Sequence, residues 1–147
     1  MTTPTATTRR IVIPDWRPAT LNELLSGRTW HKAARLKRAD RDTVAVYANL
    51  SGVRAGMERR KRRVDVLVRP AIGRRKADRD AYWKSLLDAL VHAGLLVDDA
   101  DRWCVPGDVE HRLKGPPRTE ITLTDLDGPE AGSGAGTGRG TSGRARR

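Results

Sequence analysis

The stretch that decides the fold runs from Arg74 to Asp99 and reads RRKADRDAYWKSLLDALVHAGLLVDD. Apolar side chains recur in it at the roughly 3.6-residue spacing of one buried helix face: Trp83, Leu86, Leu87, Leu90 and Val91. Gly94, which follows this pattern, is typical of the residue that ends a helix. The stretch therefore predicts an amphipathic helix that packs on the core of the domain.

Carboxylates stand at both ends of this predicted helix. Asp78 and Asp80 precede it, and Asp98 and Asp99 follow it. On an extended segment the side chains of Asp78 and Asp80 would project to one side. Mg²⁺ prefers a few carboxylate oxygens and keeps waters or substrate phosphates as its other ligands. Together with Lys84, one helical turn after Asp80, these acids predict a site for a hard divalent cation.

Each acid also has an ordinary structural explanation. Asp80, Lys84 and Asp88 stand four residues apart, and such a ladder contributes about 0.3–0.5 kcal/mol per pair. Asp78 would serve as a helix N-cap, and the Asp98–Asp99 pair would serve in a turn. The sequence leaves these explanations open beside the metal site.

The segments around this helix alternate as β-strands do. The predicted strands are residues 9–14, 62–70, an interrupted strand within 98–113, and 118–126. Val64, Val66 and Val68 fall on one side of the second strand, and Ile121 and Leu123 on one side of the last. These strands predict a small mixed sheet.

A second helix is expected from Trp30 to Asn49. Its inward residues would be Trp30, Ala33, Ala34 and Leu36. Its outward residues would be Lys32, Arg35, Lys37, Arg38 and Arg41. The predicted fold class is therefore α/β, with about four strands and two main helices.

Composition divides the chain into three parts. Residues 1–8 are Thr-rich and expected to be flexible, and residues 9–127 hold the predicted domain. Residues 128–147 contain Gly, Ser, Thr and Arg with nothing apolar larger than Ala, so they are expected to be disordered.

The charge of the chain is strongly positive, with 29 Lys and Arg against 18 Asp and Glu among 147 residues, a net charge of +11. Such a balance favours a polyanionic partner, most commonly nucleic acid, although general solubility is a competing explanation. Two basic runs would contact phosphates. Their predicted DNA-binding residues are Arg59, Arg60, Lys61, Arg62, Arg63, Arg74, Arg75 and Lys76.

Several classes of protein are not expected. No window approaches the roughly 18 apolar residues of a membrane-spanning helix, and the N-terminus lacks the apolar core of a signal peptide. The single cysteine, Cys104, fits a reducing cytoplasm and is expected to be a small buried side chain. No Gly-rich phosphate loop or dinucleotide fingerprint is present, so no small-molecule cofactor is expected.

The central thirty residues, RRKADRDAYWKSLLDALVHAGLLVDDADRW, resemble the signature of the RusA family of Holliday junction resolvases. The shared features are basic residues, an Asp-x-Asp, a lysine four residues later, an Asp-Ala-Leu helix, and a Gly followed by an Asp-Asp pair. The resemblance extends more weakly over residues 10–126. Ala81 departs from it, because the family has Asn there.

The resemblance implies a homodimeric endodeoxyribonuclease that resolves four-way DNA junctions by paired nicks, in recombination and repair, with Mg²⁺ or Mn²⁺. Asp78, Asp80 and Asp99 match its metal-binding acids, Asp98 is a further candidate ligand, and Lys84 matches its essential lysine. Two alternatives remain: a non-catalytic protein that binds branched DNA or RNA, and a nuclease of the same fold that acts on flaps or forks.

Overall fold

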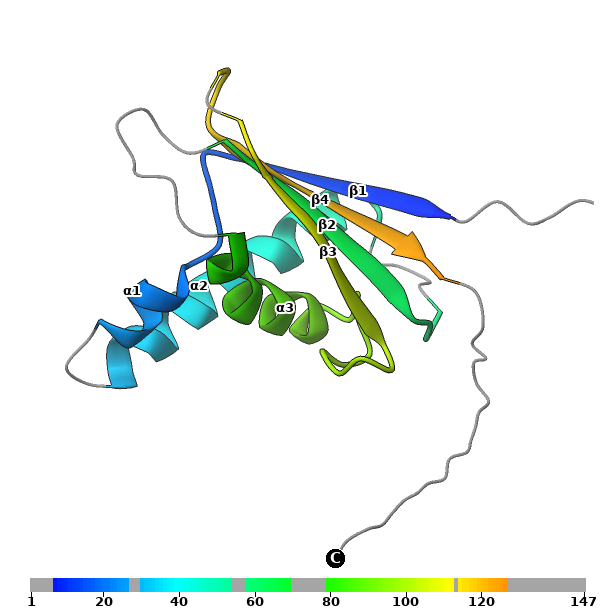
Figure 1. Ribbon diagram of the computed structural model, residues 1–147, viewed down its shortest axis with the longest axis horizontal. Helices are drawn as coiled ribbons and strands as arrows, with labels where there is room; N and C mark the ends of the chain where they lie inside the picture. The colour runs from blue at the N-terminus through cyan, green and yellow to red at the C-terminus, as the bar shows by residue number, and fades with distance from the viewer. Residues whose placement is uncertain (1–6, 27–29, 54–57, 70–78, 113, 127–147) are drawn as a thin grey trace, which may run out of the picture.

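The computed structural model describes residues 7–26, 30–53, 58–69, 79–112 and 114–126. Its elements are β1 (Thr8–Pro14), α1 (Leu21–Leu25), α2 (Trp30–Leu50), β2 (Arg62–Arg69), the 3₁₀ helix η1 (Arg79–Tyr82), α3 (Trp83–His92), β3 (Cys104–His111) and β4 (Arg118–Asp125). The fold is mixed α/β, as predicted: one four-stranded sheet with helices on one of its faces (Figure 1).

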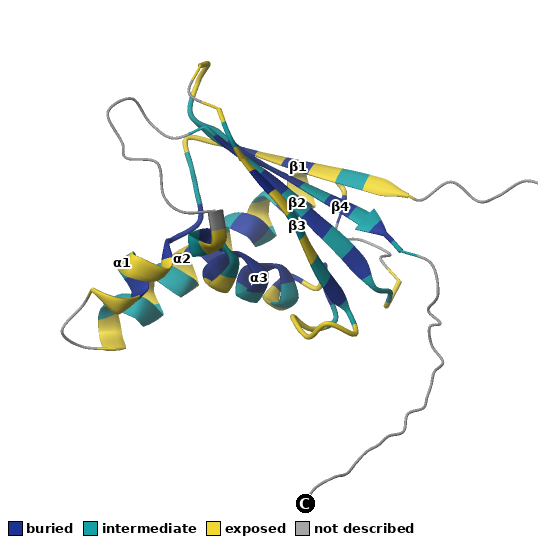
Figure 2. Cartoon of the chain, viewed as in Figure 1, coloured by how far each residue is buried: buried dark blue, intermediate teal, exposed yellow. Residues whose placement is uncertain are grey.

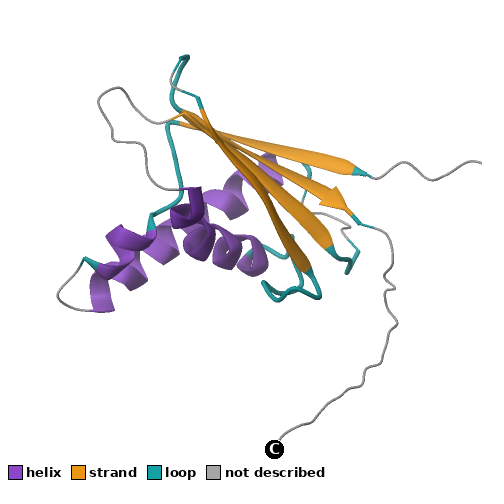
Figure 3. Ribbon diagram, viewed as in Figure 1, coloured by secondary structure: helices purple, strands orange, loops and turns teal. Residues whose placement is uncertain are grey.

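The four strands lie in the order β1-β4-β2-β3. β4 pairs antiparallel with both β1 and β2, whereas β2 and β3 are parallel. Parallel neighbours need a long crossover, and here the chain between them carries α3 across one face of the sheet. Figure 3 shows the helices gathered on one side of the four strands.

Alternation along the strands produces the core. Val64, Val66 and Val68 of β2 are buried, and Ile121 and Leu123 of β4 are fully buried beside them, as predicted. The strand residues between them are only partly buried, because they point to the face that no helix covers. Figure 2 shows this as buried segments where the sheet and the helices meet.

Helix α3 supplies most of the opposing layer. Leu86 and Leu90 have no exposed surface, and Trp83 and Val91 are partly buried against the same cluster, as the apolar spacing predicted. Gly94 has a φ of +81° and ends the helical turn, a backbone conformation that favours glycine.

The limits of helix α2 were predicted to within one residue, since the helix ends at Leu50 rather than Asn49, but its buried face begins later than expected. Trp30 was expected inward, and this was wrong: it is 73% exposed. The buried residues of α2 are Asp40, Val44 and Ala48, one turn apart in its second half, where the helix packs on α3. The first turns of α2 extend beyond the sheet (Figure 1), so Trp30 has no core to enter and lies against the ring of His31 instead.

Other predictions concern the ends and the single cysteine. Cys104 is buried at the start of β3, and burial raises the pKa of its thiol to about 11. The predicted flexible N-terminus up to residue 6 and the predicted disordered tail 128–147 lie outside the described residues. Among the described residues, no helix combines the length and the apolar character needed to cross a membrane.

Candidate functional site

Asp80 and Lys84 lie at the N-terminal end of α3. Asp80 belongs to the single turn η1, and Lys84 is the second residue of α3. Both are exposed, and neither side chain makes a hydrogen bond or ion pair with another described residue. Asp78, the other acid predicted on this side, lies outside the described residues. The N-cap of α3 is Tyr82, the last residue of η1.

The predicted ladder through Asp80, Lys84 and Asp88 is not formed, because Asp88 has another partner. Arg41 of α2 donates from Nε to one carboxylate oxygen of Asp88 at 2.8 Å and from its terminal nitrogen to the other at 3.2 Å. The hydrogen bond from Arg41 lowers the pKa of the Asp88 carboxyl. Lys84 therefore does not form an ion pair with Asp88, the ordinary structural role that its spacing suggested.

A buried carboxylate fixes the first turn of α3 from below. Asp40, on the inner face of α2, accepts a hydrogen bond from the hydroxyl of Ser85 at 2.6 Å and from the backbone N–H of Ala19 at 2.8 Å. Burial raises the pKa of the Asp40 carboxyl, and the two hydrogen bonds offset part of that rise. Through Ser85 this contact holds the turn that carries Lys84.

Asp98 and Asp99 lie in the turn that follows α3. Asp98 accepts a hydrogen bond from the backbone N–H of Asp99 at 2.7 Å, and both residues are exposed. The turn closes through the N–H of Trp103, which donates to the carbonyl of Ala100 at 2.8 Å. These contacts leave the Asp99 carboxylate without a partner among the described residues.

The two acidic groups lie at opposite ends of α3 (Figure 1). Nε2 of His111, in the last residue of β3, lies 3.3 Å from the hydroxyl of Tyr82, which places η1 beside the C-terminal end of β3. The turn with Asp98–Asp99 leads into the other end of that strand. The 10 residues of α3 span about 15 Å. Mg²⁺ holds its oxygens at about 2.1 Å, so one ion cannot be bound from both ends in one copy.

No group of three His, Cys, Asp or Glu suited to a metal ion occurs within the residues that the structure describes. The oxygen ligands themselves fit a hard cation, since Asp80 and Asp99 are exposed carboxylates with no competing partner in the described part of the chain. The structure thus separates acids that the sequence pattern grouped together.

The predicted DNA-binding residues fall into different environments. Arg59 is exposed, and Arg60 and Lys61 are half-buried, with Arg60 lying 3.5 Å from Glu58. Arg62 differs from the other predicted residues, because it is 1% exposed and donates to the carbonyl oxygens of Glu58 and Leu95. A guanidinium enclosed in this way has no open side for a phosphate. The residues Arg74, Arg75 and Lys76 lie outside the described part of the chain.

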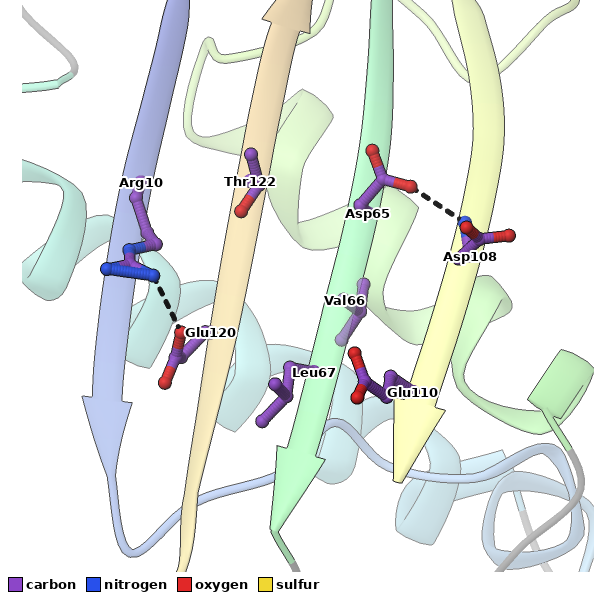
Figure 4. Close-up of a pocket in the computed structure, with 8 residues that line it drawn as sticks. All are labelled: Arg10, Asp65, Val66, Leu67, Asp108, Glu110, Glu120 and Thr122. Carbon is purple, nitrogen blue, oxygen red and sulfur yellow. Dashed lines mark hydrogen bonds and ion pairs between the residues drawn. The ribbon is translucent and has the colours of Figure 1, made fainter. Parts of the chain in front are cut away.

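Arg63 is partly engaged as well. It donates from Nε to Asp65 at 3.0 Å and reaches Asp108 at 3.6 Å. Asp65 and Asp108 also belong to the uncovered face of the sheet, where a hollow is lined by four carboxylates and by Arg10 (Figure 4). Arg10 pairs there with Glu120 at 3.0 Å. Of the acids predicted for the metal, the three that the structure describes, Asp80, Asp98 and Asp99, do not line this hollow.

Free cations that sequence reasoning did not assign to DNA lie on α2. Arg35 and Arg38 are exposed and Lys37 half-buried, and no ion pair joins any of them to another described residue. Residues three apart on a helix are neighbours, so Arg35, Arg38 and Arg41 form a basic stripe. The ion pair between Arg41 and Asp88 links this stripe to α3, where Asp88 lies one helical turn after Lys84. This stripe could have been found from the sequence, because the spacing of these cations already placed them on the outward face of the predicted helix.

Comparison with known proteins adds no family, since no protein-family model and no curated protein matches the chain.

Proposed function

We propose that this chain is a metal-dependent endonuclease that cuts branched DNA and resolves four-way junctions by paired nicks, as its resemblance to the RusA family implies. The observation that carries the proposal is the placement of exposed carboxylates at both ends of α3, with no ion-pair partner among the described residues, in a chain whose net charge is +11. Carboxylates left free in a basic protein are suited to a divalent cation, and the surrounding cations to a polyanion.

The proposed metal ligands are Asp78, Asp80 and Asp99, with Asp98 as a further candidate. The ion is Mg²⁺ or Mn²⁺, because the ligands are carboxylate oxygens. When bound, it supplies activation of water and neutralisation of charge at the scissile phosphate.

The proposed active site forms between two copies of the chain. Acids separated by the length of α3 cannot share an ion within one copy, so Asp80 of one copy meets Asp99 of the other. A twofold axis makes every such contact occur twice. Two equivalent sites result, which suits paired nicks on the symmetric strands of a junction.

Lys84 is proposed to act at the scissile phosphate. It lies one turn beyond Asp80, its ammonium is exposed, and Ser85 beside it is held by the buried Asp40. A fixed positive charge there stabilises the negative charge that develops on the phosphoryl oxygens or positions the attacking water. The duplex arms are proposed to contact Arg35 and Arg38 of the stripe, together with Arg59.

The test is nicking of a synthetic four-way junction, a fork, a flap and a plain duplex, each with Mg²⁺, with Mn²⁺ and with EDTA. We expect metal-dependent, symmetric nicks in the junction and none in the duplex. Junction binding without any nicking would replace the proposal with a non-catalytic binding protein. Preferred cutting of the flap or fork would keep the nuclease and change its substrate.

A further inference from the structure

Trp103 is a large aromatic residue that the core does not use. It is half-buried and does not belong to the buried hydrophobic cluster or to the side chains packed against it. Its backbone is nevertheless fixed on both sides: its N–H donates to Ala100 at 2.8 Å, and its carbonyl accepts from the N–H of Arg62 at 3.0 Å. The indole is therefore presented at the surface from a rigid position.

Two guanidinium groups lie against this indole. The Cζ atom of Arg102 is 5.3 Å from the ring centroid, and that of Arg59 is 5.7 Å away. Both arginines are exposed. Arg59 comes from the segment before β2 and Arg102 from the turn before β3, and the parallel pairing of these strands brings the two segments together. Contacts of this length are attractive cation–π interactions.

An indole with two guanidinium groups is suited to a flat ring that carries a phosphate. Indole rings and guanidinium planes both stack on nucleic-acid bases, and a guanidinium also pairs with phosphate oxygens. The nearby carboxylates of Asp98, Asp99 and Asp101 disfavour an acidic peptide or a simple anion. Stacking of a base on the indole is favourable despite those negative charges. The indole and its two guanidinium groups therefore favour a nucleotide as the ligand.

We propose that Trp103, Arg59 and Arg102 form a stacking site for an unpaired base of a DNA strand. This inference rests on the proposed function and deepens it, because the same turn carries the proposed metal ligands Asp98 and Asp99. A base that stacks here lies beside the scissile phosphate, and such bases are most available where strands exchange at a branch point. The stacking site thus directs cutting to branched rather than continuous duplex DNA.

The experiment measures junction binding in EDTA, so that no cleavage is required. Four-way junctions carry 5-iodouracil at successive branch-point positions, are irradiated with the protein, and the crosslinked residue is identified by mass spectrometry. Affinity is measured by fluorescence anisotropy for the wild type, Trp103→Leu, Trp103→Phe and the control Trp30→Leu. Trp30 is a matched control, because it is an exposed tryptophan in the first turn of α2 that stacks on His31.

We expect the crosslink at Trp103, and a loss of affinity of about tenfold or more in Trp103→Leu, which keeps apolar bulk but cannot stack. Trp103→Phe should retain most of the affinity, and Trp30→Leu should bind as the wild type does. Thermal melts confirm that each variant is folded.

The outcomes separate this inference from the nuclease proposal. Junction binding by Trp103→Leu at wild-type affinity, with crosslinks at other residues, overturns the stacking site even if the protein cuts DNA. A Trp103 crosslink in a protein that never nicks DNA supports the stacking site and overturns the nuclease. Absence of DNA binding by the wild type overturns both.

Discussion

Arg62 and Asp125 form an ion pair inside the molecule, with Nε of Arg62 2.8 Å from a carboxylate oxygen of Asp125. Arg9 reaches the same carboxylate at 3.0 Å from the neighbouring strand. Burial lowers the pKa of the Arg62 guanidinium, and the charge of Asp125 offsets part of that effect. The pair ties the start of β2 to the end of β4, and Arg62 also binds the carbonyl of Leu95 on the way to the Asp98–Asp99 turn.

Removing Arg62 should destabilise the whole domain. Arg62→Ala leaves the buried Asp125 carboxylate with the partly exposed Arg9 as its one remaining ion-pair partner among the described residues, so we expect the free energy of unfolding to fall by about 3–5 kcal/mol. The measurement is urea unfolding followed by circular dichroism. Arg38→Ala, at an exposed position with no ion pair to a described residue, is the control and should change stability by less than about 0.5 kcal/mol. Equal stability of the two variants would show that Arg62 is not structural.

Asp40 should make stability depend on pH. Because its pKa is raised in the folded state, the folded protein binds this proton more tightly than the unfolded chain. Its contribution to stability is therefore greatest at low pH. It declines as the pH rises from about 3.9, the ordinary value for an unfolded Asp, through the raised folded pKa.

Asp40→Asn is the variant that checks this dependence. Asn keeps an oxygen that accepts from Ala19 and Ser85, but it does not titrate. Urea unfolding of both proteins across this pH range should show wild-type stability falling relative to the variant as the pH rises. Parallel profiles would mean that Asp40 does not titrate in this range.

The α2 stripe should carry part of the salt dependence of DNA binding. Each phosphate contact contributes about 0.9 to the slope of log affinity against log salt concentration. The double variant Arg35→Gln/Arg38→Gln should therefore flatten the slope by about two, as measured by anisotropy over a salt series. Arg10→Gln removes a cation already paired with Glu120 on the uncovered sheet face and should leave the slope unchanged. A slope that is flattened by Arg10→Gln and unchanged by the double variant would show that DNA binds the uncovered face of the sheet instead.

Lys84 should matter for cleavage far more than for folding. Since Lys84 has no ion-pair partner in the described part of the chain, Lys84→Ala should cost less than about 1 kcal/mol of stability. Single-turnover nicking with saturating enzyme should fall by about 10²–10³-fold, the effect of deleting a preorganised charge. Lys84→Arg keeps the charge with a different reach and donor geometry and should also be impaired. Full activity in both variants would remove Lys84 from the site.

Much of the fold could be predicted because local patterns coincide with tertiary burial. The alternation of Val64, Val66 and Val68 specifies the inner face of β2, and Gly94 ends α3 where its pattern stops. The same alternation also contained a signal that was overlooked. Arg62 has the parity of these valines, so a strict reading of the strand would have placed it inside. Because Arg62 is a cation within a basic run, it was assigned to the predicted DNA-binding residues instead.

The geometry of the candidate site could be predicted less well, because it depends on distances between elements. A spacing along the sequence groups Asp80 with Asp99, yet the ten residues of α3 hold them apart in one copy. Asp40 could have been found from its spacing with Val44 and Ala48 on one helix face. Its partner Ser85 comes from another helix, and no local pattern in α2 identifies it.

The central claim is that acids from two copies complete one active site. Asp80→Asn and Asp99→Asn should each abolish nicking of a four-way junction in Mg²⁺, because each would remove a metal ligand from both sites of the proposed homodimer. In a mixed dimer, however, one of the two sites receives both substitutions and the other receives neither.

The most direct measurement is therefore nicking by a mixture of the two inactive variants, unfolded and refolded together in equal amounts. With random pairing, about a quarter of all sites are intact, so we expect nicking to return at about a quarter of the wild-type rate. Each mixed dimer should cut a single strand rather than resolve the junction. Wild-type activity without any recovery in the mixture would contradict the account, since it would show that each site is built within one chain.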